Sequence, residues 1–220
     1  MAGGLRIRVV GLGAVCAIAA SLVIAPPTKA DSRRDAIRVL NALPVSPERQ
    51  SGYERELFRH WSDLDKDGCS TREQVLIDER ITGRVTGCVV EGGRWFSMFD
   101  GVETDDASTF DIDHLVPLKE AWDSGAWRWN ARSRERFAND LGFPGSLVAV
   151  SASSNRSKSD RDPAEWLPER GVCAYAKAWV AVKFRWRLSV DSTEKSELTR
   201  ILRGCPPKMR VPTIARVVTR

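Results

Sequence analysis

The sequence predicts a single α+β domain that is mainly helical and has few short strands. Most segments repeat their apolar side chains at the three-to-four-residue spacing of an amphipathic helix. Only two short runs, at residues 109–115 and 146–151, have the pattern of short buried strands. Once an apolar leader is set aside, about 190 residues remain, which is enough chain for one hydrophobic core.

The first 30 residues are typical of a secretory signal peptide. Two arginines precede an apolar run at 9–25, and the segment ends with Thr28 and Ala30, small residues of the kind that precede a cleavage site. An uncleaved membrane anchor is the alternative, because a run of about 17 residues is at the lower limit for spanning a bilayer. We expect residues 1–30 to be removed and the mature protein to be secreted, without stable insertion in a membrane.

The basic residues concentrate at the two ends of the chain, which has a formal net charge of +5 at pH 7. The leader and the basic C-terminal tail at 206–220 contain no acidic residue, and the chain between them has a slight acidic excess. This distribution argues against a surface covered with basic side chains for nucleic-acid binding. We expect the tail to be a disordered end, with non-specific attraction to DNA as the alternative.

Four cysteines follow the leader, namely Cys69, Cys88, Cys173 and Cys205. An even number of cysteines in an exported chain predicts disulfide bonds, and four allow three pairings. We favour Cys69–Cys88 and Cys173–Cys205 because each pair closes a local loop. A zinc site is the rival interpretation, but no two cysteines have the spacing of a zinc-binding pair and the chain has only two histidines.

The region 31–80 is predicted to be helical with one Asp-rich turn. Its apolar spacing predicts short helices at 31–43, 53–61 and 71–81. Ser70 and Glu73 have the spacing of a capping box at the start of the third helix. Residues 85–99 alternate loosely around Gly92-Gly93, which predicts a hairpin that turns at these glycines.

Helices surround the two predicted strands in the rest of the chain. The strand at 109–115 is followed by helical residues 117–141, which are interrupted near Ser124-Gly125. The strand at 146–151 leads into a polar turn at 153–163 that opens toward a helix. Two further amphipathic helices are predicted at 173–186 and 192–202.

Asp111, Asp113 and His114 form the stretch with the clearest chemistry. Histidine is the side chain best suited to accept a proton from water near neutral pH, and carboxylates suit a hard divalent cation. After the second strand, Asn155 offers an amide oxygen as a further ligand. The basic side chains close to Asn155 are suited to phosphate groups; they are Arg156, Lys158 and Arg161.

Asp63, Asp65, Asp67 and Gly68 match the first six positions of a calcium-binding loop. The twelfth position is Gln74, where such a loop requires a bidentate glutamate. We therefore regard the three aspartates as a candidate calcium site and favour a simple capped turn ahead of the next helix.

The order of these motifs resembles the HNH endonucleases, whose core is a ββα-metal motif. The stretches DIDHLVPL and NRSKSD are similar to the start and the end of the HNH domain of CRISPR effector nucleases. The resemblance is closer to secreted HNH proteins related to the C-terminal domain of GmrSD-type restriction endonucleases, and it runs from about Tyr53 to Cys205. The landmarks are Trp61 to Arg72, Asp113 to Trp122, Phe137 to Asp140, Asn155 to Asp160, Trp166 to Pro168 and Cys173 to Tyr175.

This resemblance implies an HNH endonuclease-like domain at 81–205 that hydrolyses phosphodiester bonds in DNA, with RNA as a second candidate substrate. It implies that His114 is the general base, and that Asp113 and Asn155 complete the catalytic group and bind a divalent metal. Asp111 is a further candidate ligand. The ion implied is Mg²⁺, with Mn²⁺ and Ca²⁺ as alternatives.

Ser146 stands where the family commonly has an asparagine, just before the second strand. We expect Ser146 to support the His114 loop through a hydrogen bond to the backbone. Because of this departure, a non-catalytic extracellular protein that keeps the fold and binds nucleic acid is one alternative. A calcium-binding protein built around Asp63 to Gly68, in which His114 is only structural, is the second. The sequence does not predict the oligomeric state.

Overall fold

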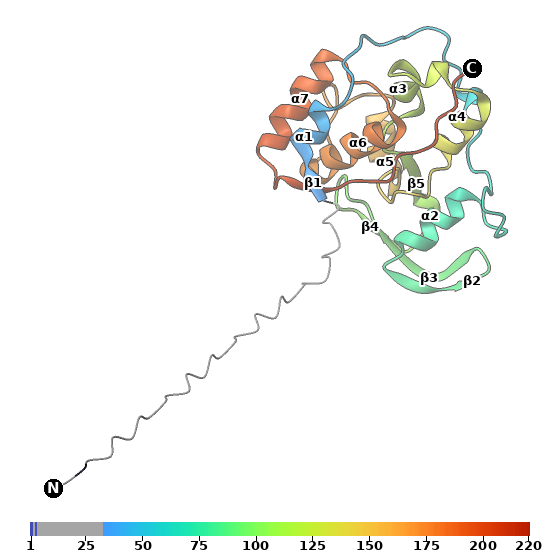
Figure 1. The fold of residues 1–220 in the computed structure, drawn as a ribbon. Helices are drawn as coiled ribbons and strands as arrows, with labels where there is room; N and C mark the ends of the chain where they lie inside the picture. The colour runs from blue at the N-terminus through green and yellow to red at the C-terminus, as the bar shows by residue number, and fades with distance from the viewer. Residues whose placement is uncertain (2, 4–32) are drawn as a thin grey trace. The chain divides into compact units, whose positions relative to one another are not determined.

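The computed structural model describes residues 33–220, together with Met1 and Gly3. The predicted signal peptide at 1–30 therefore lies outside the described residues, apart from those two. Within 33–220, no helix combines the length and the apolar character needed to cross a membrane. Helices gather around α6, and the β2–β3 hairpin projects at one end (Figure 1).

The first half of the domain contains short helices and short strands. In chain order they are β1 (Arg33–Asp35), α1 (Ala36–Asn41), the 3-10 helix η1 (Arg55–Leu57), α2 (Thr71–Glu79), β2 (Thr82–Thr86), β3 (Val89–Phe96), β4 (Glu103–Thr104), the 3-10 helix η2 (Ala107–Thr109) and β5 (Phe110–His114). Ser70 and Glu73 form the predicted capping box of α2.

The second half is mostly helical. It contains α3 (Leu118–Asp123), the 3-10 helix η3 (Ala126–Arg128), α4 (Ala131–Ala138), β6 (Leu147–Ser151), α5 (Ala152–Lys158), α6 (Val172–Trp186), α7 (Ser192–Arg203) and β7 (Lys208–Arg210). The α+β prediction, mainly helical with few short strands, is confirmed.

The described strands form three small sheets. β1 pairs with β7, β3 lies between β2 and β4, and β5 pairs with β6, all antiparallel. α5 begins directly after β6, so β5, β6 and α5 form a compact ββα unit. This unit positions the candidate site.

The largest hydrophobic core surrounds α6. Tyr175, Trp179 and Trp186 of this helix are almost fully buried and contact other aromatic rings. Burial of such large rings is the main stabilising contribution to a domain of this size. A smaller cluster, which includes Val75 and Trp95, joins α2 and the β2–β3 hairpin to β5 and β6.

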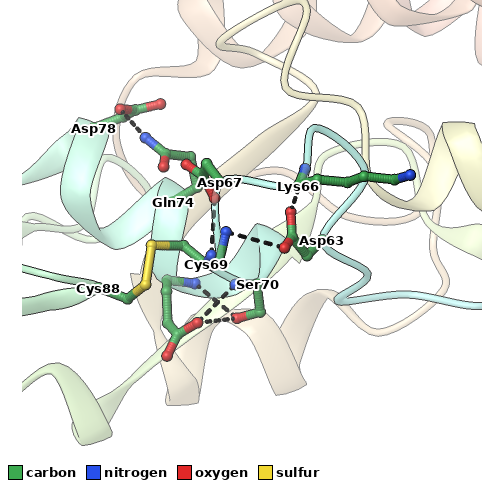
Figure 2. The surroundings of a disulfide bond; sticks show 10 residues. Asp63, Lys66, Asp67, Cys69, Ser70, Gln74, Asp78 and Cys88 are labelled. Atoms are coloured by element: carbon green, nitrogen blue, oxygen red, sulfur yellow. Dashed lines mark hydrogen bonds between the residues drawn. A yellow bond between two sulfur atoms is a disulfide. The ribbon is translucent and has the colours of Figure 1, made fainter.

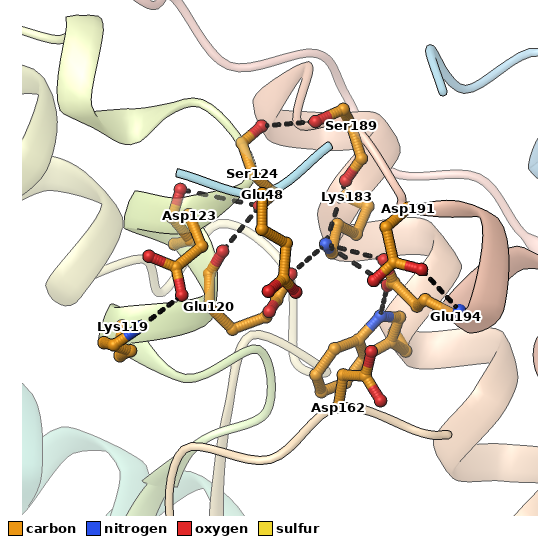
Figure 3. Close-up of polar contacts among 12 residues, drawn as sticks. Glu48, Lys119, Glu120, Asp123, Ser124, Asp162, Lys183, Ser189, Asp191 and Glu194 are labelled. Atoms are coloured by element: carbon orange, nitrogen blue, oxygen red, sulfur yellow. Dashed lines mark hydrogen bonds and ion pairs between the residues drawn. The ribbon is translucent and has the colours of Figure 1, made fainter. Parts of the chain in front are cut away.

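A buried lysine links three helices inside this core. The ammonium group of Lys183 on α6 donates hydrogen bonds to Glu120 on α3 and to Glu194 on α7. Figure 3 shows the two carboxylates converging on the Lys183 nitrogen. Burial raises the pKa of Glu120, an effect that the charge of Lys183 opposes. The positive charge of Lys183 therefore compensates the negative charge of two buried carboxylates.

Several predicted features differ from the structure. Residues 153–163, predicted as a polar turn, contain most of α5, which begins directly after β6 because the Ser151 hydroxyl caps it. The hairpin turns at Gly87-Cys88, because Thr86 pairs with Val89, whereas Gly92 and Gly93 lie within β3. Gly87 has a φ of 59°, the left-handed conformation that a two-residue turn of this kind requires. The predicted helix at 53–61 contains only η1, because Arg134 and Asn139 bind the carbonyl oxygens of Leu57 and Arg59.

The C-terminal tail is packed and not a free end. β7 pairs with β1, and Met209 and Ala215 are buried in the main core. Further along, the Asn130 N–H donates to the Val218 carbonyl over 3.0 Å. The apolar side chains between the basic ones hold the tail against the domain.

Candidate active site

The ββα unit brings the predicted site residues together from distant parts of the sequence. His114 is the last residue of β5 and lies opposite Leu147 of β6, while Asp113 lies opposite Val148. The Ser151 hydroxyl caps α5 by accepting from the Ser154 N–H, so the helix begins without a gap after the strand. Asn155 lies one turn into α5, and its side chain therefore lies beside β5.

The imidazole of His114 is buried and has one ring nitrogen fixed. Its Nε2 lies 2.9 Å from the carbonyl oxygen of Ala138, which can only accept a hydrogen bond, so Nε2 carries the proton. Nδ1 therefore keeps its lone pair. Burial lowers the pKa of His114 to about 3, which keeps the imidazole neutral in the physiological range.

Asp113 has one carboxylate oxygen with a partner and one without. Its Oδ1 accepts from the Lys158 ammonium over 2.9 Å, whereas its Oδ2 is buried and has no hydrogen-bond partner among residues 33–220. Burial raises the pKa of Asp113, and the charge of Lys158 opposes that rise. A buried oxygen without a partner is costly unless a donor or a cation reaches it.

Asn155 is oriented by Asp111. Its amide nitrogen donates to Asp111 Oδ2 over 3.0 Å, and because a carboxylate oxygen accepts, the amide oxygen of Asn155 faces elsewhere. Asp111 does not line the open pocket that contains Asp113 and Asn155, and it contacts Asn155 through this hydrogen bond, while its predicted role as a metal ligand stays a prediction. The amide oxygen of Asn155 and Oδ2 of Asp113 are oxygen atoms of the kind that a hard divalent cation prefers as ligands.

His114, Asp113 and Asn155 all line one open pocket of about 350 Å³. Exposed basic side chains, Arg55 and Arg156, also line this pocket. Arg55 comes from η1, far from the HNH-like stretch in sequence, and sequence reasoning missed it. The sequence pointed to Arg55 only as a basic residue beside the predicted apolar face at 53–61.

Lys158 differs from the prediction of a phosphate contact. Its side chain is fully buried, and its ammonium donates to Asp113 and to the His114 carbonyl oxygen over 3.0 Å. Lys158 is therefore an internal partner of the site. Arg161 is exposed but lines a neighbouring pocket, and its Nε donates to the Lys158 carbonyl. Of the three predicted basic residues, only Arg156 lines the pocket that contains His114.

Ser146 takes part in a network beside the His114 loop. Its carbonyl oxygen accepts from the Leu115 N–H over 3.1 Å, and its hydroxyl donates to Asp140 over 2.8 Å. Asp140 also accepts from Arg185 and from the Trp186 indole. The main chain next to His114 is thus tied to α6, and sequence reasoning did not identify the part that Asp140 plays.

The three aspartates of the candidate calcium site lie close together on the surface. Their carboxylate oxygens are within 4.8 Å of one another. Asp63 accepts from the N–H groups of Lys66 and Gly68, as in a capped turn (Figure 2). These hydrogen bonds are those of the capped turn that the sequence favours, and calcium binding stays a prediction.

Both predicted disulfides are present. Cys69 is bonded to Cys88 beside this turn (Figure 2), and Cys173 at the start of α6 is bonded to Cys205 just after α7. The first joins the turn to the β2–β3 hairpin, and the second ties the C-terminal segment to the core helix. The zinc alternative is therefore wrong.

Comparison with known proteins assigns the chain to a family. A family model described as the C-terminal domain of GmrSD restriction endonucleases matches residues 83–201. An uncharacterized secreted protein of Arthroderma benhamiae is 40% identical over 198 residues, which are 88% of this chain and 96% of that relative. No solved structure matches the chain. With more than half of its residues matched and the ββα unit inside the match, the chain belongs to the family of the GmrSD restriction endonuclease C-terminal domain.

Proposed function

We propose that this protein is a secreted, metal-dependent nuclease that hydrolyses phosphodiester bonds in DNA. The observation that carries the proposal is the meeting of His114, Asp113 and Asn155 at one open pocket. Membership of a family named for restriction endonucleases supports the same reaction class.

His114 has the protonation state that a general base needs. The neutral imidazole accepts a proton from water at Nδ1 while Nε2–H remains bonded to Ala138. The water oxygen forms a new bond to phosphorus, one P–O ester bond breaks, and the leaving oxygen takes a proton from solvent. A bound phosphodiester places negative charge near the ring, which favours the imidazolium against the cost of burial.

Asp113 and Asn155 are the residues that would hold a divalent cation, for which Mg²⁺ is our first choice. When bound, such an ion stabilises the charge that develops on the phosphoryl and leaving oxygens. Lys158 fixes the orientation of the Asp113 carboxylate, and Asp111 fixes that of the Asn155 amide. These contacts leave one oxygen of each ligand residue without a protein partner.

Arg156 and Arg55 are the side chains that we propose for contact with the substrate. Both are exposed at the pocket, from two separate elements, so that a phosphate over His114 meets positive charge from both. Phosphodiesters of RNA offer the same charge, and RNA cleavage is measured beside DNA cleavage in the test below.

Export of the chain completes the proposal. The similarity to a protein described as secreted and the two disulfides are consistent with an oxidising compartment. We propose that residues 1–30 are the signal that directs this export.

Cleavage of plasmid DNA by the oxidised protein in Mg²⁺ tests the proposed function. We expect EDTA to abolish nicking and His114→Ala to lower its rate by about 10²–10⁴-fold, because the general base is lost. Asp105→Ala, on an exposed loop away from the pocket, is the matched control and should keep full activity. Equal rates for the wild type and a folded His114→Ala protein would overturn the assignment, and binding of DNA without cleavage would favour the non-catalytic alternative.

A further inference from the structure

We propose that Trp61 is a positioning residue that holds the His114 imidazole in its reactive orientation. The inference rests on the proposed function, since it assigns a role toward the general base of that reaction. It names a residue that the sequence marked only as a landmark of a family pattern.

The ring of Trp61 lies against the ring of His114. Their centroids are 5.4 Å apart and their planes are tilted by 30°, close to a stacked arrangement. The Ala138 carbonyl fixes rotation of the same imidazole in its own plane through Nε2. Stacking restricts tilting of the ring and the hydrogen bond restricts its rotation, so the two contacts together define where Nδ1 points.

The backbone at Trp61 is strained. Its φ is 62°, a left-handed conformation that costs a bulky L-residue about 1–2 kcal/mol and persists only where surrounding contacts enforce it. Strain of this kind concentrates at functional sites. Here the strained residue is the one whose side chain contacts the proposed general base.

Asn139 supplies the contacts that enforce this conformation. Its amide nitrogen donates to the Arg59 carbonyl oxygen over 2.8 Å, and its amide oxygen accepts from the Ser62 N–H over 2.8 Å. The buried Asn139 side chain therefore bridges the residues on both sides of His60 and Trp61. Ser62 is held further by its hydroxyl, which donates to Glu135 over 2.9 Å.

One short segment thus sets both the hydrogen bond to the His114 imidazole and the stacking of Trp61 on it. The carbonyl oxygen of Ala138 binds the imidazole, and the side chain of the next residue, Asn139, holds Trp61 over it. We call this arrangement, formed by Trp61, Ala138 and Asn139, the imidazole clamp. The His60 ring also contacts the His114 ring edge-to-face, with centroids 6.3 Å apart, but it is not stacked on the imidazole, and its Nδ1 is bonded to the Phe58 carbonyl.

Steady-state kinetics on a duplex substrate in Mg²⁺ provide the first test. Trp61→Leu keeps an apolar side chain but offers no ring to stack, and we expect kcat to fall about 10–100-fold with KM changed less than about threefold. Trp61→Phe restores a ring and should recover most of kcat. Trp127→Ala, which removes a partly exposed tryptophan outside the clamp, should leave both constants unchanged. An unchanged kcat in Trp61→Leu, or a loss carried by KM alone, overturns the proposal.

The second readout does not depend on nuclease activity. The chain has two histidines, so ¹⁵N imidazole spectra are simple, and a His60→Gln variant assigns them. We expect His114 in the wild type to be a single tautomer protonated at Nε2. In Trp61→Leu the ring can tilt, which weakens the Nε2–Ala138 hydrogen bond, and we expect averaged nitrogen shifts. If Trp61→Leu does not fold, Asn139→Asp, which loses donation to Arg59 but keeps an acceptor for Ser62, is expected to give the same averaging. A fixed tautomer in whichever of these variants folds overturns the clamp, whereas an inactive wild type with the expected spectra overturns only the proposed function.

Discussion

Neighbouring residues on a strand direct their side chains to opposite faces, yet Asp113 and His114 line the same pocket. They do so because His114 ends β5, where the chain leaves the strand. Each of the two side chains then depends on one contact from a distant residue: Lys158 for Asp113 and Ala138 for His114.

Asp111 offers a test of how the proposed cation site is oriented. Asp111→Ala removes the acceptor for the Asn155 amide nitrogen. The amide group of Asn155 can then rotate, and its oxygen is no longer held toward the pocket. We expect Mn²⁺ affinity to fall about 10–100-fold, in line with the loss of other residues that orient ligands. Calorimetric titration with Mn²⁺ measures the change. Asp111→Asn can still accept and should bind nearly as well as the wild type, and equal affinity in Asp111→Ala would show that Asp111 does not orient the site.

Asp113, His114 and Asn155 were recognisable from sequence because their order and spacing are local to two strands and a turn. The buried position of Lys158 was not recognisable, because Arg156 and Lys158 are alike in charge and lie within one helix. Their different burial is decided by Asp113, 45 residues before Lys158, and no local pattern carries that information. The same limit applies to Asn139, whose partners Arg59 and Ser62 lie 80 and 77 residues away.

Among the elements, β6 has an outer edge that a side chain of α2 covers. The Glu79 carboxylate accepts from the Ala149 N–H over 2.8 Å, which satisfies a donor of this edge strand. Burial raises the pKa of Glu79 from 4.5 to about 7. The folded protein therefore holds this proton more tightly than the unfolded chain does.

This shift predicts how stability changes with pH. The contribution of Glu79 is complete below pH 4.5 and is lost as the pH rises through about 7, because the folded state must then ionise a buried group. Between pH 5 and pH 8, the free energy of unfolding should fall by about 1–3 kcal/mol more in the wild type than in Glu79→Gln. Urea unfolding at both pH values measures it, with the exposed Glu91→Gln as control. Parallel pH dependence in wild type and Glu79→Gln would contradict this prediction.

The regular elements were predictable where a repeating pattern or a cap defines them. The helix α2, with its capping box, and the strands β5 and β6 lie where the sequence places them. The hairpin turn was misplaced because a pair of glycines is the stronger local signal. Gly92 and Gly93 in fact lie within β3, and the turn is made by Gly87 and Cys88, next to a disulfide.

The molecule as a whole is held together by contacts that α6 makes with α3, which is distant in sequence, and with the following helix α7. Lys183 joins α6 to Glu120 and Glu194, and the Cys173–Cys205 disulfide joins the start of α6 to the end of α7. The pairing of cysteines was predictable from their number and spacing. The packed tail was not, since its basic residues are typical of a free end and its apolar residues follow neither a helical nor a strand pattern.

Lys183→Met tests the contribution of the buried ion pairs. The change leaves Glu120 and Glu194 without their cation, and we expect the free energy of unfolding to fall by about 3–5 kcal/mol. Guanidinium unfolding at pH 7.5 measures it. Lys195→Met, on a partly exposed face of α7, should change stability by less than about 0.5 kcal/mol.

Adding Glu120→Gln and Glu194→Gln to Lys183→Met removes the buried charges. The triple variant should recover much of the free energy of unfolding that Lys183→Met loses. A Lys183→Met protein as stable as the wild type would show that the two carboxylates are already neutral and need no partner.

The proposed nuclease activity requires that Asp113 and Asn155 bind one cation beside His114, and all three residues line the same pocket. Anomalous diffraction from crystals of the oxidised protein soaked in Mn²⁺ locates the ion. We predict a peak about 2.1 Å from Oδ2 of Asp113 and from the amide oxygen of Asn155, at the rim of the His114 pocket. Density confined to the turn formed by Asp63, Asp65 and Asp67, with no peak at Asp113, would contradict it.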